Sequence, residues 1–202
     1  MGVLEAPALA RVLDCAGSYR PLFELLAFTG LRIGEALGLT WADVDFDAGL
    51  LFVHRQLSRY REHAKLKTEA GRRQIVLAPA MVRLLRARWL ASPGKGPDDF
   101  VFTNSVGRPL DYRHVGEAFR VAVRRAGVRA DGRLSLHSLR HDYASLLIAE
   151  GLDVVFVSRQ LGHGDPGVTL SVYAHLYARA KHALAARSAI EAGYATMALS
   201  RS

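Results

Sequence analysis

Residues 134–147 read LSLHSLRHDYASLL, and they place two histidines and an arginine within five positions. We predict a helix over 136–150, in which His137 and Arg140, three positions apart, share one face. Both lie near the start of that helix, where the backbone N–H groups and the helix dipole favour an anion. A helix with scattered surface bases is the alternative, but it leaves the clustering unexplained. The stretch therefore predicts a site for a negatively charged group.

A histidine pair on one helix face also resembles a zinc site, because His141 follows His137 by four positions. The glutamate of that motif is missing, since position 138 is a serine. Arg140 would also hold a fixed positive charge beside the metal ion. We therefore expect no metal at this helix.

The composition favours a polyanionic partner. The chain has 202 residues, half of them apolar, with 27 basic and 19 acidic residues and a net charge of +8. A balance this basic points to nucleic acid before a membrane surface. The single cysteine, Cys15, excludes an internal disulfide and a cysteine-based zinc site. No signal peptide and no long apolar run is present, so we expect one cytoplasmic domain over 1–202.

The hydrophobic pattern predicts a mostly α fold with a small antiparallel β-sheet, an α+β class. The sheet is expected near 45–80, and the polar segment 58–71 could itself be a hairpin. Gly30 is a candidate helix C-cap. The expected strands are 50–57, 72–78 and 100–103. The expected helices are 7–17, 19–30, 32–39, 78–91, 111–126, 136–150, 153–161, 166–174 and an alanine-rich tail, 176–195.

Three other places carry candidate chemistry. TGLRIGEALGLTWADVD (29–45) holds Arg32, with Glu35 one turn later to orient its guanidinium. AKLKTEAGRRQIVL (64–77) holds Lys67 in a basic hairpin, and QLGHGDPGVTLSVYAHLY (160–177) holds His163, with Tyr173 ten residues later. Taken singly, each has an ordinary alternative: a surface ion pair, a solvated lysine and a core tyrosine.

Four motifs, in their order along the chain, resemble the catalytic domain of a tyrosine recombinase of the phage-integrase family. They are TGLRIGEALGLTW, LKT…GRRQIVL, LHSLRHDYAS and LGHGDPGVTLSVYAH. The resemblance runs from about residue 5 to 180. The resemblance implies two supporting residues, Glu35 and His141. Tyr173 is chosen over Tyr177 because of its spacing from His163 and the following Ala-His. The residues that match the family's catalytic positions are Arg32, Lys67, His137, Arg140, His163 and Tyr173.

The family reaction is phosphoryl transfer on DNA, in which a tyrosine leaves a 3′-phosphotyrosyl link and a free 5′-hydroxyl. A phenol, with a pKa near 10, is both a usable nucleophile and a good leaving group. The resemblance implies that Arg32 and Arg140 hold the non-bridging oxygens, and that His163 donates a further hydrogen bond. His137 would accept the tyrosine proton or tune that oxygen, and Lys67 would protonate the leaving oxygen. Neither a nucleotide cofactor nor a metal is expected.

The expected partner is double-stranded DNA, contacted through the basic residues Arg72, Arg73, Arg113, Arg120 and Arg124. The resemblance implies self-association on DNA, as a tetramer in the synaptic complex and a monomer free in solution. The tail 176–195 would dock on a neighbouring protomer or pack on its own domain. The family's N-terminal core-binding domain has no counterpart here, which predicts an excised domain or a truncated product.

We expect the integrase of a phage or another mobile element. Two alternatives stay open: a catalytically silent DNA-binding module of the same fold, and a metal-dependent nuclease. Loss of activity in Tyr173→Phe separates the recombinase from the silent binder. Resistance to EDTA separates it from the nuclease, which would need a carboxylate cluster that the acidic residues do not form.

Overall fold

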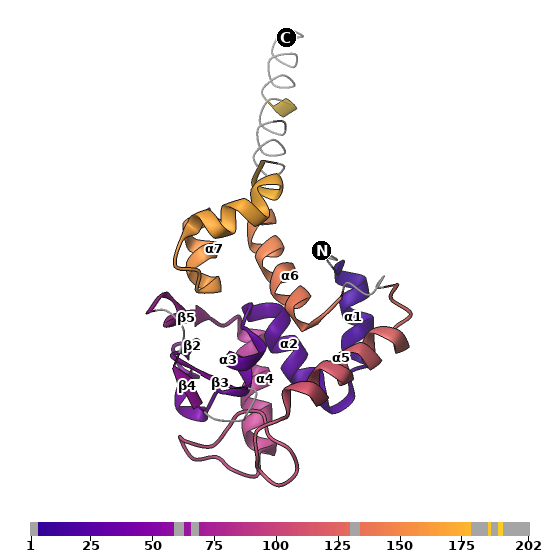
Figure 1. Cartoon of the computed structure of the whole chain (residues 1–202), viewed down its shortest axis with the longest axis vertical. Helices are drawn as coiled ribbons and strands as arrows, with labels where there is room; N and C mark the ends of the chain where they lie inside the picture. The colour runs from indigo at the N-terminus through magenta and orange to yellow at the C-terminus, as the bar shows by residue number, and fades with distance from the viewer. Residues whose placement is uncertain are drawn as a thin grey trace, which may run out of the picture.

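The computed structural model describes residues 4–58, 63–65, 69–129, 134–178, 186 and 190–191. Its helices are α1 (Ala6–Asp14), α2 (Arg20–Thr29), α3 (Ile33–Leu37), α4 (Pro79–Ala91), α5 (Tyr112–Arg125), α6 (Leu136–Ala149), α7 (Val154–Leu161) and a further helical stretch at 166–178. Its strands lie at one edge of the molecule, beside α2, α3 and α4 (Figure 1). Three 3₁₀ turns are η1 (Gly17–Tyr19), η2 (Trp41–Asp43) and η3 (Glu69–Gly71). The predicted mostly α fold with a small antiparallel sheet is confirmed.

The predicted strand 50–57 is divided at His54 into two strands that belong to different sheets. β2 (Leu50–Val53) pairs antiparallel with β1 (Val44–Asp45) on one side and with β5 (Arg73–Val76) on the other. β3 (Arg55–Leu57) instead pairs antiparallel with β4 (His63–Lys65), so the first strand of this pair lies in the predicted strand 50–57 and not in the segment 58–71. The pairing of β2 with β5 carries the chain back toward α3 and sets Arg73 opposite Val53.

The predicted strand 100–103 is absent, although the segment is buried as expected. Val101 and Phe102 have almost no exposed surface. The segment makes only isolated bridges, Thr40 with Phe100 and Thr103 with Pro109. The segment that pairs with Phe100 at Thr40 enters η2 at the next residue. It therefore does not run beside residues 100–103 for long enough to form a ladder.

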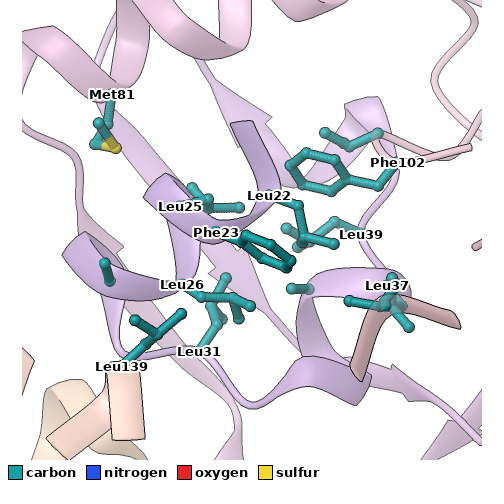
Figure 2. Packing of buried hydrophobic residues seen from close by; sticks show 14 of the residues in the cluster. Leu22, Phe23, Leu25, Leu26, Leu31, Leu37, Leu39, Met81, Phe102 and Leu139 are labelled. Atoms are coloured by element: carbon teal, nitrogen blue, oxygen red, sulfur yellow. The ribbon is translucent and has the colours of Figure 1, made fainter. Parts of the chain in front are cut away.

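The main core centres on α2, whose side chains meet both the sheet and the other helices. Figure 2 shows Phe23 among Leu22, Leu26 and Leu39. Phe23 also meets Phe119 of α5 edge to face, with ring centroids 5.3 Å apart. Burying such a side chain stabilises the fold by roughly 1.5–3 kcal/mol, which makes α2 the element that holds the layers together.

A second, smaller core joins α6, α7 and the helical stretch 166–178. Its buried members include Ile148, Val157, Leu161 and Tyr173. α6 also lies against α2, so it connects the two cores. Because Tyr173 belongs to this second core, its helix is held against α6 and not only by the chain on either side. Within the residues that the structure describes, no helix is long and apolar enough to cross a membrane.

Candidate active site

The turn between α2 and α3 places Arg32 at the edge of the site. Gly30 ends α2 in the left-handed conformation, with φ 63°. Arg32 is then the N-cap of α3, and its backbone N–H donates to Glu35 Oε2 at 2.8 Å. Its guanidinium donates to Glu35 Oε1 at 2.9 Å and keeps 41% of its side chain exposed. The sequence Gly-Leu-Arg therefore combines a helix stop and a helix start, with the arginine directed outward.

Glu35 is fully buried and joins Arg32 to Arg73. Arg73 is the first residue of β5. Its guanidinium donates to Glu35 Oε2 at 2.8 Å and to Oε1 at 3.2 Å. Burial by itself raises the pKa of Glu35. The hydrogen bonds and charge of Arg73, together with Arg32, lower that pKa by more, so the net shift is downward. The carboxyl is therefore ionised and orients both guanidinium groups.

The prediction that Arg73 contacts DNA does not match its position. Its side chain is only 5% exposed, and Nε donates to the backbone oxygen of Gln160 at 2.7 Å. Gly162, which ends α7, leaves room for it, since a Cβ there would meet the guanidinium at 2.8 Å. Arg73 thus ties β5 and α3 to the end of α7.

Arg140 is buried beneath the same helix end. Its guanidinium donates to the backbone oxygens of Gly30, at 2.6 Å, and of Leu161. A third N–H points at His163 Nε2, 3.1 Å away. Burial lowers the pKa of Arg140 to about 9, and the charge of Arg32 adds to the effect. Since arginine has five N–H donors, three described bonds leave two for an incoming anion.

His163 is held between Arg140 and Thr169. Its Nδ1 lies 2.8 Å from the hydroxyl of Thr169, which is fully buried. Because arginine only donates, His163 Nε2 accepts from Arg140, and Nδ1 therefore carries the proton of the neutral ring. Burial, then Arg140 and Arg32, lower the pKa of His163 to about 4. In this arrangement the ring has no Nε2 proton to donate, in contrast to the donor role that the resemblance implies.

Tyr173 contacts His141 and not His137. The phenol oxygen lies 2.5 Å from His141 Nδ1, and the phenol itself is 5% exposed. Burial raises the pKa of Tyr173 to about 12, against the opposing charge of Arg140. His137 meets the ring of His141 edge to face, with centroids 4.8 Å apart. The predicted nucleophile, Tyr173, therefore contacts α6 through His141, which the sequence analysis assigns only a supporting role.

A cavity of about 420 Å³ opens beside these groups. It is lined by Arg32 and His137 on one side and by Tyr112 and Arg120 of α5 on the other. Burial, then Arg140 and Arg32, lower the pKa of His137, which shows that positive charge gathers at this wall. The cavity therefore joins the predicted phosphate-binding groups to the predicted DNA-binding helix.

The remaining predicted residues are placed as follows. Arg72 is exposed at the start of β5, and Arg113 and Arg124 are exposed on α5, where Arg124 shares Glu117 with Arg120. The hydroxyl of Tyr177 is buried without a hydrogen-bond partner among the described residues. Lys67 and most of the tail 176–195 lie outside the described residues. Over the described ranges, no three His, Cys, Asp or Glu side chains gather as metal ligands.

Sequence reasoning missed Thr169, and it assigned Arg73 to the DNA and not to Glu35. Thr169 had no signal beyond its helical spacing. Arg73 was recognised as basic, but its burial was not, because nothing local to GRRQIVL says which of the two arginines turns inward. The period of two in a strand does separate Arg72 from Arg73, and this is the one signal that could have indicated it.

Comparison with known proteins gives matches along most of the chain. The model of the phage integrase family matches residues 7–179. Tyrosine recombinase XerC of Xylella fastidiosa (strain 9a5c) is 34% identical over 157 residues, covering 78% of this chain and 48% of that protein. Transposase A from transposon Tn554 of Staphylococcus aureus is 30% identical over 181 residues, covering 86% of this chain and 48% of that protein.

A solved structure shares the fold. The Tn1549 transposon integrase (residues 82–397), in complex with circular intermediate DNA, superimposes with a TM-score of 0.77 at 23% identity. The match covers 92% of this chain and 66% of that one. At this identity the likeness concerns the fold alone. The chain spans about half the length of the curated relatives it matches.

Proposed function

The chain belongs to the phage integrase family, and from this premise we propose that it is the catalytic domain of a site-specific recombinase that cuts and rejoins DNA through Tyr173. The phenol oxygen attacks the scissile phosphate, forms a 3′-phosphotyrosyl link and releases a 5′-hydroxyl. The observation that carries the proposal is the position of that phenol, hydrogen-bonded to His141, the residue next to the buried Arg140. The nucleophile and the anion-binding group therefore belong to one cluster.

Arg140 and Arg32 are the proposed clamp for the non-bridging oxygens. Arg140 is held by two carbonyl oxygens and has two N–H groups left, while Arg32 is fixed by Glu35 and exposed on its outer side. Burial and the charge of Arg32 lower the pKa of Arg140, and an incoming phosphate would stabilise the charged guanidinium against both. Such preorganised donors act on the charge that develops in the transition state, and each is worth about 3 kcal/mol of barrier.

The proposed proton transfers use neighbouring groups. A phosphate beside His163 raises the pKa of its ring, and a doubly protonated ring donates from Nε2. In that state His163 takes the expected donor role, whereas Nε2 of the neutral ring accepts from Arg140. Lys67 is the proposed acid for the leaving 5′ oxygen, because an ammonium gives up its proton far more readily than a guanidinium. The phosphotyrosyl link keeps the energy of the broken bond, so the proposal needs neither a nucleotide cofactor nor a metal.

DNA is the proposed partner along α5 and the cavity at its side. Arg113, Arg120 and Arg124 are exposed on α5, and Arg120 also lines the cavity that contains Arg32. With Arg72, they are proposed to contact the phosphate backbone. Assembly of a tetramer on DNA is part of the proposal, and the tail 176–195 would either dock on a neighbouring protomer or pack on its own domain.

A supercoiled plasmid tests the proposal without knowledge of the target site. The wild type, Tyr173→Phe and Tyr177→Phe are each incubated with the plasmid in EDTA. We expect relaxed topoisomers, and protein attached to DNA in SDS, with the wild type and Tyr177→Phe but not with Tyr173→Phe. Activity that survives Tyr173→Phe and is lost in Tyr177→Phe would move the nucleophile to Tyr177. Activity abolished by EDTA would support a metal-dependent nuclease instead.

A further inference from the structure

The contact between Tyr173 and His141 has a chemical direction. The phenol oxygen and His141 Nδ1 are 2.5 Å apart, so one of them donates a proton to the other. A phenol O–H is a much stronger acid than the N–H of a neutral imidazole, and an imidazole nitrogen is a much better acceptor than a phenol oxygen. The favoured arrangement is therefore O–H···Nδ1, with the histidine proton on Nε2.

That arrangement leaves an unusual group behind. His141 Nε2 is buried and has no hydrogen-bond partner among the described residues. Buried polar groups are nearly always paired, and an exception calls for a functional reason. The contact that keeps Nδ1 free of a proton of its own is the hydrogen bond from the phenol. A surface histidine that only packed against the tyrosine would not need this tautomer.

Burial and the charges around His141 disfavour its protonated form. Burial lowers its pKa, and so do the positive charges of His137 and Arg140. A neutral ring can accept a proton, whereas an imidazolium cannot. His137 is less suited to that step, because it is more open to solvent than His141 and lines the cavity with Arg32. The two histidines of α6 thus face different partners: His137 the predicted phosphate pocket, and His141 the phenol.

We propose that His141 is a catalytic residue that accepts the phenolic proton of Tyr173 as the phenol attacks phosphorus. This inference rests on the proposed function. The proton moves to Nδ1, and the electron pair of the O–H bond stays on the phenol oxygen, which forms the new P–O bond. The bond from phosphorus to the 5′ oxygen breaks, and its pair leaves with that oxygen, which takes a proton from the acid. In the reverse step, His141 returns the proton to the phenol.

The timing of the transfer follows from the resting state. Burial holds the pKa of Tyr173 at about 12, so the phenol keeps its proton until the O–P bond begins to withdraw electrons. The base then acts only in the transition state, which is where an interaction accelerates a reaction. A phenol that stays protonated between reactions is also a poor nucleophile, so it does not attack other groups.

A measurement without DNA tests the hydrogen-bond direction first. Nitrogen-15 NMR of the histidine-labelled protein distinguishes a ring protonated at Nε2 from one protonated at Nδ1, and His141→Asn assigns the signals. We expect His141 as the Nε2–H tautomer, with a bare Nδ1. A proton on Nδ1 in the resting protein would overturn the proposal, because the nitrogen that faces the phenol would already be occupied.

The second test uses the acidity of the phenol as the variable. Covalent protein–DNA complexes are measured on supercoiled plasmid for the wild type, His141→Asn and His137→Asn, each with Tyr173 and again with 3,5-difluorotyrosine at that position. Asparagine preserves a hydrogen bond to the phenol but cannot take its proton. With tyrosine we expect His141→Asn to lose on the order of a hundredfold to ten-thousandfold in rate, as for other general bases.

Fluorination separates a base from a packing residue. Fluorination makes the phenol a much stronger acid that depends less on a base, so the loss caused by His141→Asn should shrink sharply, while the loss caused by His137→Asn should not. An equal loss with both tyrosines, or no loss at all, would refute the role of His141 and leave the proposed function standing. A wild type that forms no covalent complex would instead refute the proposed function, and this step with it.

Discussion

The buried ion pair between Glu35 and Arg73 should dominate the stability of the site. Arg73→Met keeps most of the side-chain length but removes the two bonds to Glu35, at 2.8 and 3.2 Å, and the bond to the backbone of Gln160. Glu35 is then a buried charge with only Arg32 beside it, and Arg32 is 41% exposed. Breaking a buried pair from one side costs about 3–5 kcal/mol. For a domain of this size, that lowers Tm by roughly 6–20 °C.

Urea unfolding of matched variants measures this cost. Arg86→Met is the control, because Arg86 pairs with Asp47 at 3.2 Å on the surface, where both side chains are more than half exposed. That variant should lose at most about 1 kcal/mol. The double variant Glu35→Leu/Arg73→Met should recover much of the loss, since no charge is left unpaired. The reasoning is wrong if Arg73→Met costs no more than Arg86→Met.

The same pair predicts how the difference depends on pH. The pKa of Glu35 is lower in the folded protein than in the unfolded chain, where it has its ordinary value. The stabilisation is therefore fully present above the unfolded pKa and is lost as pH falls through the folded pKa. The gap between the wild type and Arg73→Met should be widest near neutral pH and should narrow in acid. A gap that stays constant down to the acid unfolding limit would contradict this assignment.

Two further predictions concern neighbouring positions. Gly30→Ala should destabilise the protein clearly more than Gly127→Ala in urea unfolding. Both glycines have φ near +63°, but only at Gly30 would the new Cβ meet Tyr143, at 2.4 Å. Equal losses would show that Tyr143 moves aside freely. Because the pKa of His163 is lowered to about 4, the unfolded chain takes up its proton first as pH falls below about 6.5. Stability should therefore decline between about pH 6.5 and 4, and His163→Gln should reduce that decline; an unchanged slope would place the titration elsewhere.

Local rules account for most of the fold that was predicted. Gly30 ends α2, and Arg32 with Glu35 begins α3, because a left-handed glycine and a capping box act within a few residues. A hairpin was expected within 58–71, whereas the pair of β3 and β4 begins at Arg55. The strand division at His54 was not expected, because an unbroken run of β-type residues does not show which partner each half will meet.

The candidate residues were found largely by order and spacing, whereas their partners were not. Arg140 was expected to hold a phosphate, and the structure adds the two backbone oxygens that position it. The three-residue spacing of His137 and Arg140 correctly put them at one end of α6. The same spacing could not say that the phenol of Tyr173 would contact His141, because the contact joins residues 32 positions apart.

The sequence alone determined the class of fold, the order of the elements and the residue types of the proposed phosphate site. These depend on helix and strand periods, on caps and on charge, all of which act over a few neighbours. Only the tertiary structure decided that Arg73 turns inward to Glu35 and that His141 faces Tyr173. Each of these contacts depends on how β5, α3, α6 and the stretch 166–178 pack together, and burial then sets the charge state of every group that they bring into contact.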